Sequence, residues 1–236
     1  MDTQTRHALK HDRFVDSTNA TLEWAADNRG TLIRYGMIAL AVIVLIIAAI
    51  WTYAVRQQNA QNLLGQGLSI YQTPLRVPGE PAEEAQGSYD TAAARAKAAY
   101  PLFEKAANQY GWLRPGEDAR YFAGLADMDM GDQSKAESEL KKASKAHDRN
   151  IAALAQMALA SLYVQMGNTS KAIDIYNKLI KNPTMTVPAS AAQLELAGLY
   201  ENSNPDKAKQ IYAEVKDKNS KTAAGQIAAE QLQKLK

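Results

Sequence analysis

The sequence predicts an all-α protein with one N-terminal transmembrane helix followed by a solenoid of stacked helical hairpins. Two observations carry this prediction. Residues 36–55 contain no charged side chain and no proline, and residues from about 92 onward repeat a helical pattern at intervals of about 36 positions. We found no convincing run of alternating β-branched residues after the apolar stretch, so we expect residues 56–236 to be helical throughout.

Residues 36–55 are long enough to cross a bilayer. A helix of 20 residues is ~30 Å long, which is the thickness of the hydrocarbon core. One face of a globular helix would need polar side chains toward water, and this stretch lacks charged ones. A cleaved signal sequence usually has an apolar region of about 7–15 residues, so the stretch and its 35-residue leader favour a permanent anchor.

Basic residues beside the apolar stretch predict its orientation. Arg29 and Arg34 precede it, whereas Arg56 alone follows it closely. Because basic residues gather on the cytoplasmic side, we expect a cytoplasmic N-terminus in a bacterial inner membrane and residues 56–236 in the periplasm. The inverted topology, with the repeats in the cytoplasm, is the alternative.

Residues 1–35 are a polar tail in which TLEWAADN could form a short amphipathic helix. Ser17 or Asn19 would cap this helix, and Gly30 would end it. The segment is either a solvated tail or a helix docked on the membrane or on a partner. His7 and His11 share a helical spacing but lack a third ligand, so we expect no metal site.

After the apolar stretch, a helical pattern continues until residues 73–87. That segment holds three prolines and two glycines and is predicted to be a loop.

The repeat begins beyond this loop. The segments GDQSKAESELKKA and GNTSKAIDIYNKL start at Gly131 and Gly167, which we expect to end one helix in a left-handed turn. The next residues are expected to cap the following helices: Asp132, Asn168 and, in a third copy, Asn204. Small residues would let the paired helices approach closely, with larger ones filling the space beside them: Ala136, Ala172 and Ala208, then Leu140, Tyr176 and Tyr212.

This pattern resembles the tetratricopeptide repeat. The copy at residues 153–183 carries the whole pattern: Leu159, Ala160, Tyr163, Gly167, Ala172, Tyr176 and Pro183. Three further copies, at about 92–110, 117–147 and 190–216, match less completely; the second has Asp127 where the pattern expects an aromatic residue. The first copy is expected to be split, with its first helix leaving the membrane, and residues 222–236 fit a closing helix.

The whole layout is similar to the ancillary subunit of the bacterial Sec translocon, which associates with the SecYEG channel and a membrane-anchored periplasmic chaperone. This resemblance implies a membrane-anchored interaction module that links the translocon to periplasmic chaperones or emerging exported polypeptides. A scaffold of another envelope complex, unrelated to secretion, would share the same layout and is the alternative function.

Composition argues against other functions. The chain has no cysteine, and its 27 basic and 25 acidic residues are intermixed, so nothing indicates thiol chemistry or a nucleic-acid footprint. We found no phosphate-binding glycine loop and no convergent polar triad. We therefore expect no enzyme activity, cofactor, metal or small-molecule substrate.

The resemblance implies that the first helix of each hairpin lines a concave surface that binds protein partners. Most of the expected residues are apolar, and methionines adapt to varied partners. They are Tyr121, Leu125, Met128, Leu154, Met157, Ser161, Val164, Leu194 and Glu201. Mutual burial is the alternative for Leu154 and Leu194.

Overall fold

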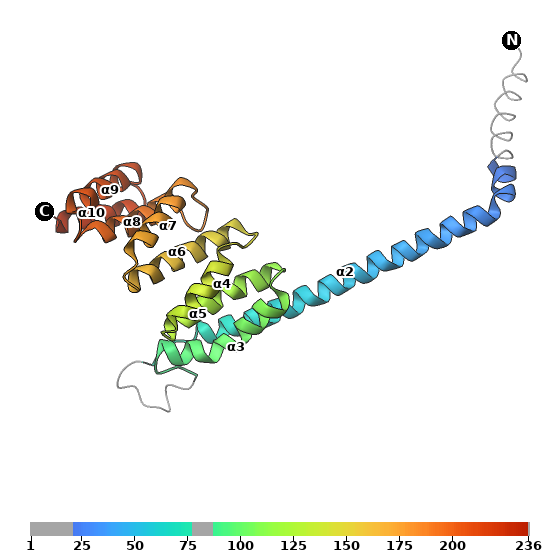
Figure 1. The fold of residues 1–236 in the computed structure, drawn as a ribbon, viewed down its shortest axis with the longest axis horizontal. Helices are drawn as coiled ribbons and strands as arrows, with labels where there is room; N and C mark the ends of the chain where they lie inside the picture. The colour runs from blue at the N-terminus through green and yellow to red at the C-terminus, as the bar shows by residue number, and fades with distance from the viewer. Residues whose placement is uncertain (1–20, 77–86, 236) are drawn as a thin grey trace, which may run out of the picture. The chain divides into compact units, whose positions relative to one another are not determined.

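The computed structural model describes residues 21–76 and 87–235. These residues are mainly helical, and their β-type pairing is limited to one isolated bridge between Leu75 and Tyr89, which confirms the all-α prediction. Figure 1 shows the order of the helices. Their bounds are α2 Arg29–Tyr71, α3 Ala92–Tyr110, α4 Arg114–Asp129, α5 Gln133–Ala143, α6 Arg149–Gln165, α7 Thr169–Lys181, α8 Ala189–Tyr200, α9 Pro205–Lys218 and α10 Ala223–Lys234.

The chain divides into two compact units, Met1–Val55 and Arg56–Lys236. In the first unit, the apolar part of α2 has a mean hydropathy of 2.7 over its most apolar window, and none of that window is buried. Its length and composition suffice to cross a membrane. The predicted caps Ser17 and Asn19 lie outside the described residues.

The prediction that Gly30 ends the short N-terminal helix is wrong. Residues 21–27 are helical, a single turn residue follows, and α2 begins at Arg29 with Gly30 inside it. The Asn28 carbonyl accepts hydrogen bonds from the N–H groups of Thr31 and Leu32, so helical hydrogen bonding resumes directly after this turn residue. A glycine costs a helix only about 1 kcal/mol, and the long apolar run that follows outweighs this cost.

The second unit begins with the predicted split hairpin. Residues of α2 after Val55 pack against α3: Leu64 and Leu68 contact the cluster around Ala99 and Phe103. The Tyr71 hydroxyl donates a 2.6 Å hydrogen bond to Asp129 Oδ2 and so joins α2 to α4. Residues 77–86 of the predicted loop lie outside the described residues.

Three hairpins follow: α4 with α5, α6 with α7, and α8 with α9. Gly131 and Gly167 adopt φ values of 79° and 74°, which confirms the predicted left-handed turns. The Asn204 side chain accepts from the Lys207 N–H at 3.2 Å, as expected of a cap. Asp132 caps α5 in the same way, through the Lys135 N–H at 3.1 Å.

The predicted N-cap at Asn168 is confirmed in position, although not through its side chain. Asn168 occupies the N-cap position of α7, but its side chain makes no capping hydrogen bond. Its backbone carbonyl accepts from Lys171 and Ala172 instead, so the helix starts without the side chain.

The small and large residues of the repeat form the core as predicted. They are all buried: Ala136, Ala172, Ala208, Leu140, Tyr176 and Tyr212. The largest core cluster runs from α5 to α8, and α10 packs against α9 and α8 through a cluster that includes Ala208 and Ala228. Because α10 covers the last hairpin, it acts as the closing helix of the stack.

Candidate protein-binding site

A groove of about 500 Å³ opens between α6, α8 and α10. Its apolar lining comes from Val164, Leu194, Leu199 and Ile227. Ile227 lies on the closing helix and is 45% exposed, so its side chain is accessible from the groove. The groove can therefore bury apolar side chains of another molecule.

Polar groups interrupt the apolar lining at a few points. Tyr176 of α7 and Tyr212 of α9 reach the groove from the second helices of their hairpins, and the exposed Glu195 lies with them. The Tyr212 hydroxyl donates a 2.7 Å hydrogen bond to Glu201 Oε1. Burial, together with the Glu201 carboxylate, raises the pKa of Tyr212, so this hydroxyl stays protonated and remains a donor.

The structure brings only part of the predicted set together. All nine predicted residues are partly buried. Ser161, Val164 and Leu194 line the groove.

The other six predicted residues lie elsewhere. Four of them pack against the core cluster of α5 to α8: Tyr121, Met128, Leu154 and Met157. Leu125 is half-buried on α4, and Glu201 is engaged by Tyr212. That these six residues bind a partner stays a prediction.

Sequence reasoning missed the residues that α10 contributes. Ile227 and Gln231 line the groove only because the closing helix lies beside α8. The sequence did contain an indication of this site, because Ile227 is apolar although the closing helix was expected to have a polar outer face. Its exposure, however, depends on how α10 packs.

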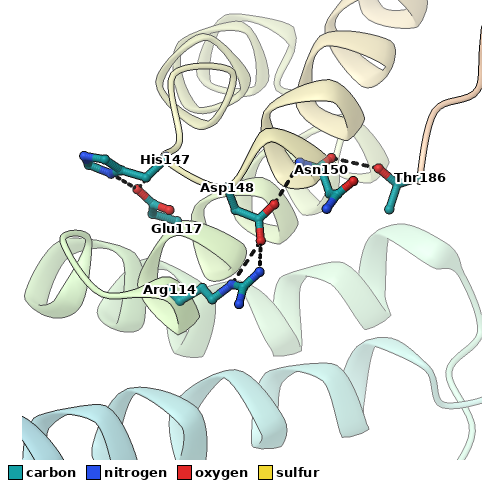
Figure 2. Close-up of polar contacts among 6 residues, drawn as sticks. All are labelled: Arg114, Glu117, His147, Asp148, Asn150 and Thr186. Carbon is teal, nitrogen blue, oxygen red and sulfur yellow. Dashed lines mark hydrogen bonds and ion pairs between the residues drawn. The ribbon is translucent and has the colours of Figure 1, made fainter. Parts of the chain in front are cut away.

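A polar cluster lies at the edge where α4 and α6 begin (Figure 2). Arg114 Nε donates to Asp148 Oδ2 at 3.0 Å, and a second guanidinium nitrogen contacts the same oxygen. The Glu117 carboxylate accepts from the His147 backbone N–H at 3.0 Å, and His147 Nδ1 lies 2.6 Å from the same oxygen. These contacts join α4 to the loop that precedes α6.

The cluster continues toward α8. Asp148 Oδ1 accepts from the Asn150 N–H at 2.8 Å and so caps α6, while the Thr186 hydroxyl donates to the Asn150 carbonyl at 3.0 Å. Figure 2 shows Asp148 placed between Arg114 and Asn150. The cluster therefore ties the starts of successive first helices together.

The charges of this cluster are stabilised by hydrogen bonds. Burial raises the pKa of Glu117, but the hydrogen bonds from His147 outweigh burial and hold that pKa below its usual value. The Arg114 guanidinium lowers the pKa of Asp148. Within residues 21–76 and 87–235, no group of three or more histidine, aspartate or glutamate side chains could hold a metal ion.

Comparisons with known proteins agree with the hairpin architecture. A sequence profile of the tetratricopeptide repeat matches residues 154–184, which cover α6 from Leu154 onward, α7 and the start of the following loop. A crystal structure of a tetratricopeptide repeat protein from Parabacteroides merdae is similar, with a TM-score of 0.52 and 19% sequence identity. The match covers 75% of this chain and 60% of that one. No curated protein matches this chain.

At this identity the structural likeness shows the fold alone. The chain contains a tetratricopeptide-like hairpin stack, and such stacks serve protein–protein interaction.

Proposed function

We propose that this protein is a membrane-anchored interaction module whose groove between α6, α8 and α10 holds apolar or amphipathic polypeptide segments. The observation that carries the proposal is the groove itself, with its apolar lining and few polar groups. Sites of this composition bind ligands mainly through apolar burial and use the polar groups for orientation. In this proposal the protein has no catalytic role.

The apolar part of α2 supplies the anchor. Residues 36–55 would span a bacterial inner membrane, with the N-terminus in the cytoplasm and residues 56–236 in the periplasm. The exposed, apolar surface of α2 supports membrane insertion, and the flanking arginines favour this orientation. A reporter that is active only in the periplasm, fused after Lys236, tests the topology; an inactive reporter would place the hairpins in the cytoplasm.

The partner we propose is the Sec translocon. The layout of tail, single span and hairpin stack resembles the translocon's ancillary subunit, so the protein would link the channel to periplasmic chaperones or exported polypeptides. Tethering raises the local concentration of a partner without new contacts. Crosslinking in intact membranes should attach channel subunits. Attachment of another envelope complex, without the channel, would support the scaffold alternative and overturn the Sec role.

Ile227→Glu tests the groove more cleanly than a change at Met157. Met157 packs against the core cluster, so a charge there would also disturb folding. Ile227 is 45% exposed in the groove, and a carboxylate there should weaken partner capture at least about tenfold.

Gln226→Glu is the matched control, since it places the same charge on the same helix at an exposed residue outside the groove lining. The Gln226→Glu variant should capture the partner as well as the wild type does. Equal capture by the wild type and Ile227→Glu would show that the groove does not hold the partner.

A further inference from the structure

Three adjoining recesses lie along the edge where α4 and α6 begin and α7 ends, and all three include Arg149. The first, of about 600 Å³, runs from Trp112 to Asn150; the second, of about 670 Å³, extends to Met185. The third, of about 280 Å³, includes Lys178 of α7. We call this surface, defined by Trp112, Arg149, Lys178 and Met185, the Arg149 edge.

The two cations of this edge are not neutralised. Within the described part of the chain, no carboxylate forms an ion pair with Arg149 or Lys178. The two acids that line these recesses are already engaged, since Asp148 binds Arg114 and caps α6, and Glu117 binds His147 (Figure 2). The edge therefore offers positive charge that a carboxylate from another molecule can pair with.

Two large apolar side chains stand at the ends of the edge. Trp112 is 56% exposed, and Met185 is 95% exposed in the loop between α7 and α8. Met185 stays outside the core although Val187, two residues later in the same loop, is buried. Exposed aromatic and methionine side chains beside an arginine are the composition that interfaces favour.

We propose that the Arg149 edge docks an acidic polypeptide segment whose carboxylate pairs with Arg149 and whose apolar side chains cover Trp112 and Met185. Charge complementarity selects this partner, because Arg149 and Lys178 carry positive charges that no described carboxylate pairs with. A bilayer of anionic lipid fits less well: basic lipid-binding clusters usually hold about 4–8 lysines or arginines, and here cations alternate with the carboxylates Glu117 and Asp148. This second surface is distinct from the groove, which includes none of these residues.

The test measures binding of a fluorescent synthetic peptide of alternating glutamate and leucine to the full chain in nanodiscs of zwitterionic lipid. We expect saturable binding that a peptide with lysine in place of glutamate does not show. Arg149→Glu should weaken binding about threefold to tenfold, and Met185→Ala by about threefold. An acidic residue suits the first turn of α6, so Arg149→Glu should keep the fold, which circular dichroism checks.

Lys221→Glu is the charge-matched control, since this exposed lysine lies between α9 and α10, away from the edge, and its binding should equal the wild type's. Weakening by Ile227→Glu, with none by Arg149→Glu, would place the peptide in the groove and overturn the proposal. If Lys221→Glu weakened peptide binding as much as Arg149→Glu does, the change in net charge would explain the effect, and the proposal would be overturned. Loss of peptide binding on adding vesicles with phosphatidylglycerol, but not with phosphatidylcholine alone, would assign the edge to a lipid surface and overturn it as well.

Discussion

The ring of Phe103 on α3 lies directly against Gly67 on α2. A methyl group at position 67 would lie 2.5 Å from Phe103 Cε1, and Phe103 is fully buried and cannot retreat easily. Tyr71 packs edge-on against the same ring with centroids 5.8 Å apart. Gly67 therefore permits the close contact by which α2 joins the hairpin stack.

Gly67→Ala should destabilise the domain. The added methyl overpacks the contact with Phe103, which costs about 1–3 kcal/mol and outweighs the gain in helix propensity. Gly65→Ala is the control, because a methyl there meets nothing within 4 Å. Denaturant unfolding of the full chain in detergent should give Gly65→Ala a higher free energy of unfolding than Gly67→Ala. The reverse order would contradict the packing argument.

Two asparagines at equivalent helix starts should differ when each is replaced by alanine. Asn204→Ala should lower the free energy of unfolding by about 1 kcal/mol, because its side chain accepts the Lys207 N–H. Asn168→Ala should cost much less, since its side chain makes no capping hydrogen bond. Thermal unfolding compares the two variants, and equal losses would show that the Asn168 side chain stabilises the start of α7 after all.

Asp127 is a buried carboxylate whose two oxygens make no hydrogen bond to any described residue. Burial raises its pKa to about 6, and the Asp132 carboxylate adds to the shift while Lys135 opposes it. Because the folded state binds this proton more tightly than the unfolded state, Asp127 lowers stability progressively as the pH rises from about 4 to about 6.

Asp127→Asn should therefore raise the free energy of unfolding at neutral pH by about 1–3 kcal/mol and flatten its pH dependence in that window. Some dependence should persist, since burial also raises the pKa of Asp118 to about 6. Unfolding measured across this pH range checks the prediction, with the exposed Asp174→Asn as control. An unchanged profile in Asp127→Asn would show that Asp127 is not the titrating group.

Glu117 should show the opposite pH dependence. Its pKa is held below its usual value by hydrogen bonds from His147, despite burial, so its stabilising effect is present at neutral pH and is lost as the pH falls below about 4.5. Glu117→Ala should destabilise the chain at pH 7 by about 1–3 kcal/mol, because the His147 backbone N–H loses its acceptor.

Chemical denaturation at neutral and acidic pH tests this, with the exposed Glu195→Ala as control. The difference between Glu117→Ala and the wild type should shrink in acid. A difference that does not change with pH would argue that packing, and not the charge, stabilises this link.

The local features of the repeat were readable from the sequence. The glycine turns at Gly131 and Gly167 were predictable because a left-handed backbone favours glycine, and the buried alanines because helices that cross closely need small side chains. The position of α3 followed from the repeat spacing, whereas α10 was predicted because a helical stack needs a closing helix. Gly30 was misjudged because the long apolar run after it outweighs the helix cost of a glycine. The Asn168 side chain makes no capping hydrogen bond, because the Asn168 backbone carbonyl accepts the first hydrogen bonds of α7.

Surfaces formed by residues far apart in the chain could be identified only from the packed structure. Ile227 and Val164 line one groove because α10 packs beside α8. Among the described residues Arg149 has no ion pair, and the adjacent Asp148 is engaged by Arg114 and by the start of α6. The sequence by itself determined the helical class, the apolar anchor-length segment and the hairpin period, since these follow from local hydrophobicity and spacing. Only the tertiary structure decided which half-buried side chains face a groove and which charges remain unpaired, because both depend on neighbours far apart in the chain.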